Sequence, residues 1–299
     1  MRASYKGVPP APERPYDPPM PTTSADPPAT LDLVALDRLM RHAAARAAAF
    51  IADRAATRGT LTWEHKGPAD FVSEVDVGAE QRIREALLVA YPDAHFVGEE
   101  SYDPSAGLGP GLGFVADPLD GTTNFLHGFP WYAVSIGATF AGTPIAGVVH
   151  NAATGEVFSA THGGGAVRRT RPDAAPEPIA VSSTADPARA LIGTGFPFKN
   201  HEEIPAYSRQ FAVVTRATAG IRRAGSAALD LCDVACGRFD AFWELNLSPW
   251  DLAAGLVIIR EAGGVVTTPT GAEATVSHNG LCTGSPAMHR WLLDVLQSA

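Results

Sequence analysis

The chain has 299 residues, of which 45% are hydrophobic and 18% charged, a composition typical of a globular protein with one large domain or two closely packed ones. Its formal net charge of −9 argues against a broad nucleic-acid-binding surface, and its three cysteines form no paired framework of the kind found in secreted proteins. The N-terminus shows no secretory signal, and glycine and proline interrupt the longest uncharged segment, residues 121–155, so we expect a cytoplasmic protein that binds neither nucleic acid nor a membrane.

The first residues differ in composition from the rest of the chain. Residues 1–30 contain 9 of the 25 prolines and no leucine, isoleucine or phenylalanine, so they cannot bury enough apolar surface to offset the entropy lost on ordering. We therefore expect a flexible N-terminal arm over residues 1–30. Residues 31–299 are expected to form one folded domain, in which two subdomains share a cleft and meet near residues 180–190.

From residue 31 onward the hydrophobic pattern predicts both helices and strands. An apolar face from Leu33 to Ile51 predicts a first helix, with Thr30 as a possible N-cap and Gly59 as its stop. Further helices are predicted over residues 77–90, 227–236, 251–262 and 286–297, and strands over residues 96–97, 113–116, 179–181, 191–193, 239–245, 265–268 and 281–283. Short turns between residues 133–140, 145–150 and 156–160 predict an antiparallel meander. We expect an α/β fold (layered α+β) with sheets between layers of helices rather than a uniform doubly wound sheet.

Five acidic residues lie beside predicted strand ends or helix starts: Asp76, Glu99, Asp117, Asp120 and Asp251. In the segment 117–121, a turn would hold two of these carboxylates close together and expose the carbonyl oxygen of the leucine between them. Hard oxygen ligands of this kind suit Mg²⁺. Two bare carboxylates about 5 Å apart repel each other by roughly 3 kcal/mol at an effective dielectric constant near 20, so a bound cation would stabilise the cluster. An ordinary surface turn is the alternative interpretation of this segment.

The residues after this turn favour an anion site. Threonine and asparagine, as in Thr122, Thr123 and Asn124, are residue types that begin helices. The backbone amides of Gly121, Thr122 and Thr123 can therefore point outward from a helix N-terminus, which is a site for a phosphate group. The sequence thus predicts a metal site next to a phosphate site.

Three segments carry a resemblance to a known family: Gly98-Glu99-Glu100-Ser101, Asp117-Pro118-Leu119-Asp120-Gly121-Thr122-Thr123-Asn124-Phe125 and Trp250-Asp251-Leu252-Ala253-Ala254-Gly255. In this order they resemble the three signatures of the inositol monophosphatase family of Mg²⁺-dependent, lithium-sensitive phosphatases. Further similarity at residues 66–76, 193–198, 222–228 and 261–264 extends the resemblance over about residues 31–297. The resemblance implies an αβαβα sandwich of the inositol monophosphatase and fructose bisphosphatase-like type, and a homodimer.

The resemblance also implies roles for individual residues. Two to three Mg²⁺ ions would bind: one to Glu99, Asp117 and the Leu119 carbonyl, a second to Asp117, Asp120 and Asp251, and a weaker third near Glu99 and Asp76. Asp76 and Thr122 would orient and deprotonate the attacking water. The amides of Gly121, Thr122 and Thr123 would bind phosphate, helped by Glu99, Leu119 and Asp120, and the alcohol side would be lined by Arg222, Gly225, Ser226, Ala227, Glu244 and Asp251.

The implied reaction is hydrolysis of myo-inositol monophosphate and related small phosphate monoesters by an activated water, without a phosphoenzyme. Thr123-Asn124-Phe125 and the position of Glu244, seven residues before Asp251, favour the inositol branch. A phosphatase of fructose 1,6-bisphosphate, histidinol phosphate or adenosine bisphosphate is the alternative within this class. In a different class, the chain would act mainly as a non-catalytic regulatory partner of a macromolecule.

Other conspicuous residues have ordinary structural interpretations. Cys232 and Cys236 share a helix face without a second pair of ligands nearby, so we expect core thiols rather than a zinc site. Arg168–Pro178 is predicted to be a surface loop rather than a second anion site. Lys66 either neutralises the acidic site or is a solvated loop residue.

Overall fold

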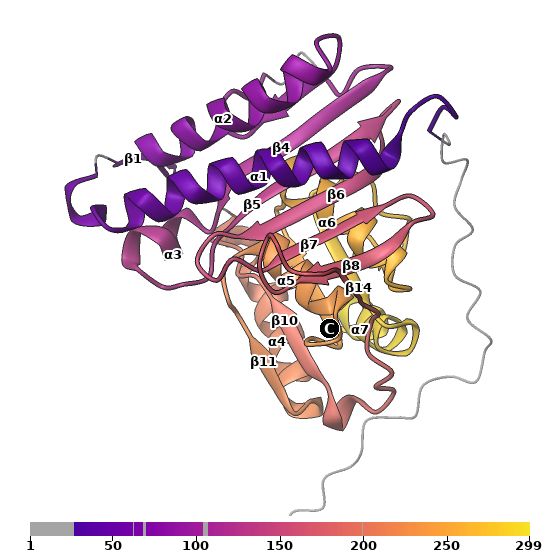
Figure 1. The fold of residues 1–299 in the computed structure, drawn as a ribbon. Helices are drawn as coiled ribbons and strands as arrows, with labels where there is room; N and C mark the ends of the chain where they lie inside the picture. Colours follow the sequence, from indigo (N-terminus) through magenta and orange to yellow (C-terminus); the bar gives the residue numbers. More distant parts are fainter. Residues whose placement is uncertain (1–26, 62, 68–69, 104–106, 199) are drawn as a thin grey trace, which may run out of the picture.

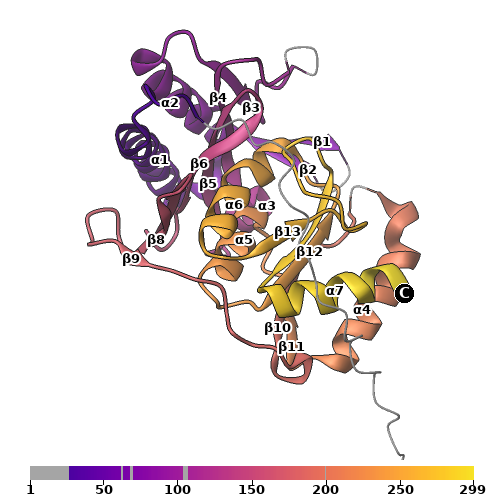
Figure 2. The ribbon, with the colours of Figure 1, turned by 90° about the vertical axis from the view of Figure 1, so that its right-hand side faces the viewer.

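The computed structural model describes residues 27–61, 63–67, 70–103, 107–198 and 200–299, so the predicted N-terminal arm lies almost wholly outside the described residues. Helices and sheets alternate in layers, in the order two helices, a seven-stranded sheet, two central helices, a five-stranded sheet and two outer helices (Figures 1 and 2). This order confirms the expected αβαβα sandwich.

The larger sheet contains the predicted meander. Its strands, in spatial order, are β3 (His95–Gly98), β4 (Leu112–Asp120), β5 (Ala133–Phe140), β6 (Thr143–Asn151), β7 (Val157–Thr161), β8 (Gly165–Arg169) and β9 (Glu177–Pro178). β3 and β4 run parallel, and every other neighbouring pair is antiparallel. Because helices pack on both faces, β5 and β6 are buried almost continuously rather than at alternate residues.

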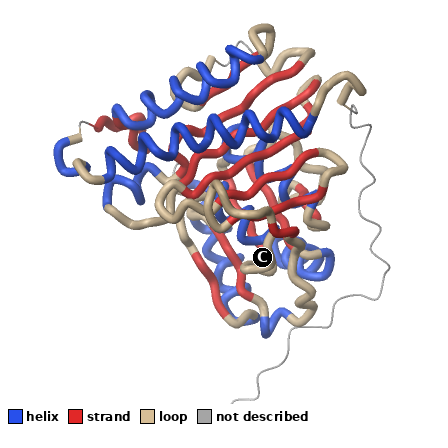
Figure 3. The backbone as a smooth tube through the Cα atoms, in the orientation of Figure 1, coloured by secondary structure: helices blue, strands red, loops and turns tan. Residues whose placement is uncertain are grey.

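Two long helices, α1 (Leu33–Ala55) and α2 (Glu74–Ala90), cover the outer face of this sheet (Figure 3, helices in blue in front of red strands). The N-cap of α1 is Asp32, whose carboxylate accepts hydrogen bonds from two amides of the first turn, so the prediction of Thr30 as the cap is wrong. The helix also ends before Gly59. The side of α1 that packs on the sheet follows helical spacing, with buried Leu36, Met40, Ala43, Ala47 and Ile51.

The central helices are α5 (Ala227–Ala235) and α6 (Pro249–Glu261), which lie between the two sheets (Figure 2). Every residue of α5 is buried, as expected for a helix with neighbours on all sides. Helix α6 approaches the larger sheet so closely that a Cβ atom at Gly137 or Gly147 would overlap atoms of the helix. Glycines in these strands therefore permit the close packing of α6 at Ala253 and Ala254.

The smaller sheet has the spatial order β11 (Gly220–Arg222), β10 (Leu191–Thr194), β12 (Ala241–Leu245), β14 (Gly280–Gly284) and β13 (Val265–Thr267). β10 runs parallel to both of its neighbours, whereas β14 is antiparallel to both of its own. Helices α4 (Ile204–Ala217) and α7 (Pro286–Ser298) cover its outer face. The sequence predicted α7 but not α4. A short hairpin of β1 (Trp63–Gly67) and β2 (Asp70–Ser73) lies outside both sheets.

The segment between the sheets differs from prediction. Residues 179–181 are not a strand, because the amide of Ile179 still donates to Ala166 of the larger sheet whereas that of Val181 donates to Ala262, so the segment leaves the sheet here. The predicted loop over Arg168–Pro178 begins within β8 and ends in β9. The change from one sheet to the other falls between Pro178 and Leu191, so the subdomain boundary near 180–190 stays a prediction that this change favours. Among the described helices, none combines the length and apolarity that crossing a membrane requires, and the cytoplasmic location stays a prediction.

Candidate active site

Glu99 and Asp117 are neighbours because the strands that precede them run parallel and in register. Gly98 at the end of β3 pairs with Ala116 in β4, so the next residue of each strand lies at the same edge of the sheet. The amide of Glu99 donates to the carbonyl oxygen of Ala116 at 3.1 Å, which holds the two chains together at this point. The parallel pair thus places two acidic side chains side by side.

A β-bulge brings Asp117 and Asp120 to the same side of β4. Asp117 pairs with Ser135 and Asp120 with Ala133, so three steps along β4 oppose two steps along β5. Residues three apart in a regular strand point to opposite faces of the sheet. The extra residue in the bulge places the side chains of Asp117 and Asp120 on the same face. The amide of Leu119 donates to Asp117 Oδ1 at 2.9 Å instead of joining the sheet. The acidic segment is therefore a buried bulge and not a surface turn.

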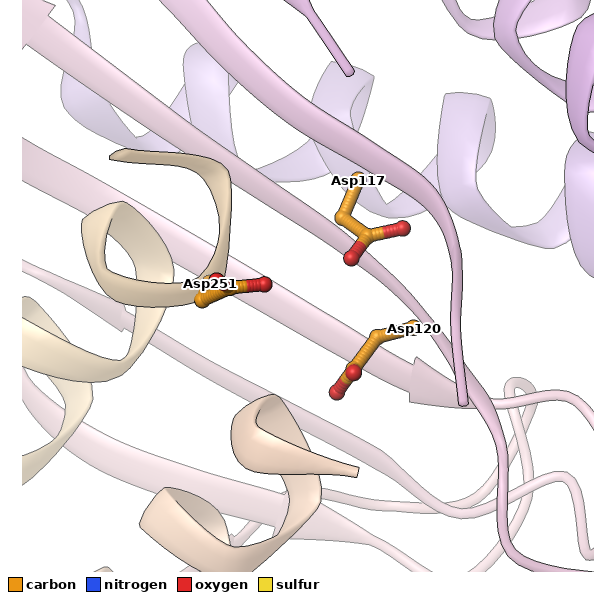
Figure 4. A group of neighbouring side chains, drawn as sticks. All are labelled: Asp117, Asp120 and Asp251. Atoms are coloured by element: carbon orange, nitrogen blue, oxygen red, sulfur yellow. The ribbon is translucent and has the colours of Figure 1, made fainter. Parts of the chain in front are cut away.

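Asp251 reaches the same place from a different layer. It is the third residue of α6, and its Oδ2 accepts a hydrogen bond of 2.6 Å from the amide of the N-cap residue Ser248. Figure 4 shows the side chains of Asp117, Asp120 and Asp251 pointing toward one another from strand and helix. One oxygen of each carboxylate lies within 4.8 Å of the others, a spacing that could hold a metal ion.

The carboxylates repel one another in the protein alone. Burial, followed by repulsion from Glu99, Asp120 and Asp251, raises the pKa of Asp117 well above its usual range. Burial also raises the pKa of Asp120, although a hydrogen bond of 2.5 Å from Ser226 Oγ stabilises its charged form. A cation would remove this repulsion, and oxygen donors of this kind are those that Mg²⁺ prefers. The donor set therefore fits Mg²⁺.

Asp76 and Thr122 form a hydrogen-bonded pair beside the carboxylates. Thr122 Oγ1 lies 2.9 Å from Asp76 Oδ1 and 3.0 Å from the carbonyl oxygen of Leu119, and its one proton serves one acceptor at a time. Asp76 Oδ2 accepts hydrogen bonds from the amide and the hydroxyl of Ser73, at 2.7 and 2.6 Å. Burial nevertheless raises the pKa of Asp76. Because Thr122 lines the cavity, it connects the cavity to a buried base.

A short helix, α3 (Thr122–His127), begins directly after the bulge. Its N-cap is Gly121, whose φ of 90° lies in the left-handed region that favours glycine. Residues 121–123 line the cavity, and the first amides of a helix have no acceptor within the helix. Asn124 Nδ2 donates to the carbonyl oxygen of Ala224 at 2.9 Å, which ties α3 to the segment before α5.

The cavity has a volume of about 300 Å³ and extends from the carboxylate cluster to the smaller sheet. Glu244 of β12 reaches it beside Gly195, where a Cβ atom on the glycine would overlap the Glu244 carboxylate. Six carboxylates line the cavity, whereas the described lining residues include one basic side chain, Arg223. Its guanidinium lies over the rings of Phe196 and Phe198, at 5.5 and 5.2 Å from their centroids. A phosphate dianion could enter so negative a cavity only together with cations.

The residues predicted for the alcohol side differ in where the structure places them. Gly225, Ala227 and Glu244 line the cavity. Ser226 is 1% exposed and contributes indirectly, since its hydroxyl donates a hydrogen bond to Asp120 Oδ2.

Arg222 lies elsewhere. It ends β11 with an exposed side chain and does not belong to the described residues that line the cavity, whereas Arg223 does. Arg222 is the last residue of β11 and Arg223 follows it, and the sequence alone does not show which of the two adjacent arginines faces the cavity. Sequence reasoning also missed Asp230, a buried cavity residue in α5. The available signal was an acidic residue one turn after Ser226 in a helix whose other residues, apart from Asp233, are apolar.

The remaining predictions concern residues away from the cavity. Cys232 and Cys282 are buried, and no cysteine belongs to a potential metal-ligand group in the described part of the chain. Arg168 Nη2 pairs with Glu177 at 2.7 Å, so this arginine is engaged by a carboxylate at the surface. The side chain of Lys66 lies outside the described residues.

Fold and site together define a layered α/β protein with an oxygen-rich, carboxylate-lined cavity suited to a hard cation. The sequence matches the model of the inositol monophosphatase family over residues 33–299. It is 42% identical over 232 residues to an inositol-1-monophosphatase of Rhizobium meliloti, across 78% of this chain and 85% of the relative. It is also 40% identical over 258 residues to the Nus factor SuhB of Pseudomonas aeruginosa, across 85% of this chain and 93% of the relative.

Structural comparison leads to the same family. The crystal structure of the extragenic suppressor protein suhB from Bartonella henselae superposes with a TM-score of 0.81 at 37% identity, covering 89% of this chain and 99% of that chain. The chain belongs to the inositol monophosphatase family, and membership implies a phosphatase.

Proposed function

We propose that the protein is a Mg²⁺-dependent phosphatase that hydrolyses myo-inositol monophosphate and related small phosphate monoesters. The observation that carries this proposal is the convergence of three carboxylates, within 4.8 Å, beside the exposed first turn of α3 in one cavity. The similarity to a relative named inositol-1-monophosphatase supports the inositol ester as the first substrate to test.

The carboxylates around the bulge would hold the metal ions. Glu99, Asp117 and the Leu119 carbonyl would bind one Mg²⁺, and Asp117, Asp120 and Asp251 a second, with a third near Glu99 and Asp76. The chemistry gained from bound Mg²⁺ is Lewis-acid activation of water and neutralisation of the charge that develops on the leaving oxygen. Ser226 and Ser248 fix the orientations of Asp120 and Asp251 for this task.

Thr122 and Asp76 would prepare the nucleophile. When Thr122 donates its hydroxyl proton to Asp76, its oxygen can accept a proton from a water in the cavity. The water's proton thus moves to Thr122 Oγ1 while the hydroxyl's own proton moves to Asp76 Oδ1, 2.9 Å away. The raised pKa of Asp76 makes this buried carboxylate a stronger base than an exposed one.

The two ends of the cavity would bind the two parts of the ester. The amides of residues 121–123 would donate to the phosphoryl oxygens, as unpaired amides of a first helical turn can. Glu244, with Gly225 and Ala227, would bind the alcohol, and we assign the basic position on this side to Arg223 instead of Arg222.

A metal-dependence assay combined with a substrate panel tests the proposal. Activity toward small phosphate monoesters should vanish in excess chelator and return with Mg²⁺, and myo-inositol 1-phosphate should be among the best substrates. Fructose 1,6-bisphosphate, histidinol phosphate and adenosine bisphosphate are the comparison substrates. Full activity in excess chelator would eliminate the proposed mechanism.

A second candidate function follows from the relative that is named a Nus factor. This chain is 40% identical to that protein over 258 residues. We therefore propose, as the alternative, that the chain acts as a regulatory partner of a macromolecule. A partner alone would not need the buried carboxylates, which are costly to keep without a cation. Absence of turnover on every small phosphate ester with Mg²⁺ present would favour this alternative. A homodimer remains part of the proposal, and sedimentation analysis tests it.

A further inference from the structure

One acidic side chain in the cavity has no part in the catalytic scheme. Asp230 lies on α5, one turn after Ser226, and lines the cavity although it is 1% exposed. Its Oδ1 is buried and has no hydrogen-bond partner within the described part of the chain. Burying a polar group without a partner costs about 1–3 kcal/mol of folding free energy. A ligand group that completes its hydrogen bonding would explain why such a side chain is present.

The surroundings of Asp230 determine what that ligand can be. Burial, followed by the charges of Glu244, Asp233 and Asp120, raises the pKa of Asp230 well above its usual range. A phosphoryl group at this position would meet further negative charge, whereas a neutral hydroxyl could accept from or donate to the carboxyl group. The position therefore suits the alcohol part of a substrate and not its phosphate.

We propose that Asp230 is a specificity-determining residue that hydrogen-bonds a hydroxyl group of the leaving alcohol. Asp230 comes from α5 and Glu244 from β12, so the two side chains approach the alcohol from different elements and would fix its orientation together. The cavity of about 300 Å³ suits a compact alcohol. The preferred substrates are thus phosphate monoesters of small polyols, and simple alkyl or aryl esters cannot use this contact. The inference rests on the proposed phosphatase function and narrows its substrate class.

Paired esters test this role. Asp230→Ala, or Asp230→Ser if the alanine variant does not fold, is compared with wild type on myo-inositol 1-phosphate and on p-nitrophenyl phosphate with Mg²⁺. We expect kcat/KM for the inositol ester to fall about tenfold or more, and for the aryl ester less than about threefold, because one hydrogen bond to a polyol is lost. Asp230→Asn, which keeps the size and hydrogen-bonding capacity, should recover much of the loss.

Asp233→Asn is the matched control. Asp233 lies on the same helix and is 3% exposed, but it pairs with Arg238 at 3.0 Å and is outside the cavity lining. Its replacement should change kcat/KM for both esters by the same factor. A selective loss in the Asp230 variants combined with a uniform effect in this control would support the inference.

Several outcomes would overturn the role of Asp230. Equal losses of kcat/KM on both esters, or a loss below about threefold on the inositol ester, would show that Asp230 does not contribute to recognition of the alcohol. If wild type hydrolyses neither ester, the proposed function fails, and calorimetric titration with myo-inositol 1-phosphate and Mg²⁺ tests Asp230 separately. Weaker binding to the variant would then support the inference, whereas equal or absent binding would refute it.

Discussion

The contact between Gly195 and Glu244 allows a test of whether the Glu244 carboxylate binds the alcohol part of the substrate. Gly195 does not have a positive φ, so its backbone accepts alanine without strain. The added methyl group would overlap the carboxylate of Glu244, which is the end of a flexible side chain. We therefore expect Gly195→Ala to fold normally and to displace this carboxylate.

The size of the effect follows from the geometry. Carbon atoms in contact need about 3.5–4.0 Å, so the carboxylate must move by on the order of 1 Å or more. Hydrogen bonds span about 2.7–3.2 Å, and a shift of that size breaks them. Loss of hydrogen bonds to a charged group costs about 1.5–3 kcal/mol, which corresponds to roughly ten- to hundredfold in kcat/KM for myo-inositol 1-phosphate.

The assay compares this ester with p-nitrophenyl phosphate, which has no ring hydroxyls and should be hydrolysed within a few-fold of the wild-type rate. Glu244→Gln should give the same selective loss, and the double variant should lose less than the sum of both because the two changes act on one contact. Gly220→Ala is the matched control, since its methyl group would meet ordinary contacts of 3.4 and 3.5 Å. Unchanged activity of Gly195→Ala on the inositol ester, or equal loss on both esters, would refute the reasoning.

The other predictions concern the metal site and the base. Asp120→Asn and Asp251→Asn should each lower kcat/KM by on the order of a hundredfold or more, because each removes a carboxylate from the proposed metal site. The metal-free protein should keep or gain stability, since each change removes a charge from a repulsive cluster. Wild-type rates in either variant would contradict the assignment of these residues as metal ligands. Thr122→Ala should lower kcat more than it raises KM, because the hydroxyl lies between cavity and Asp76; a pure KM effect would argue against the relay. Ca²⁺ should inhibit the Mg²⁺-activated enzyme because its looser coordination misplaces the water, and Li⁺ should also inhibit; activation by Ca²⁺ in a titration would contradict this.

The acidic residues of the cavity were predictable because their signals are local. Strand-ending residues such as Glu99 and the segment around Asp117 and Asp120 are visible in the sequence as acids after short apolar runs. The structure shows why they converge. The parallel register of β3 and β4 brings Glu99 and Asp117 together, and a bulge turns Asp120 to the same side as Asp117. Neither register nor bulge can be read from one sequence, because both depend on pairing with distant strands.

Residues whose role depends on packing between layers were harder to predict. Arg222 and Arg223 are adjacent arginines, and the sequence does not show that Arg223, which follows the last residue of β11, lines the cavity whereas Arg222 does not belong to the described lining. Asp230 is buried because α5 lies between two sheets, which its own sequence does not reveal. Helix α4 was missed because just two of its residues, Tyr207 and Val214, are buried.

Raised carboxylate pKa values also predict how stability depends on pH. An acid whose pKa is higher in the folded than in the unfolded chain binds more protons when folded, so the free energy of unfolding falls as the pH rises through the folded pKa. Asp117 has such a pKa, and each unit of elevation is worth about 1.4 kcal/mol at high pH. Burial lowers the pKa of His150 and His289 to about 4. Between pH 4 and 6.5 the unfolded chain binds more protons at these residues than the folded chain, so their contribution makes the free energy of unfolding rise with pH.

Comparison with Asp117→Asn separates these contributions, since both histidines are present in wild type and variant and cancel in the difference. In chelator, wild type should be less stable than the variant at about pH 8 and should gain on it as the pH falls to about 5, because the raised pKa makes this carboxyl group bind a proton more readily in the folded chain than in the unfolded chain. Saturating Mg²⁺ should stabilise wild type far more than the variant at the higher pH, because binding to the folded state alone shifts the unfolding equilibrium. Chemical denaturation at both pH values measures these differences. A stability difference that does not change with pH would show that Asp117 is already ionised without strain, and the cation would then not be needed to relieve repulsion.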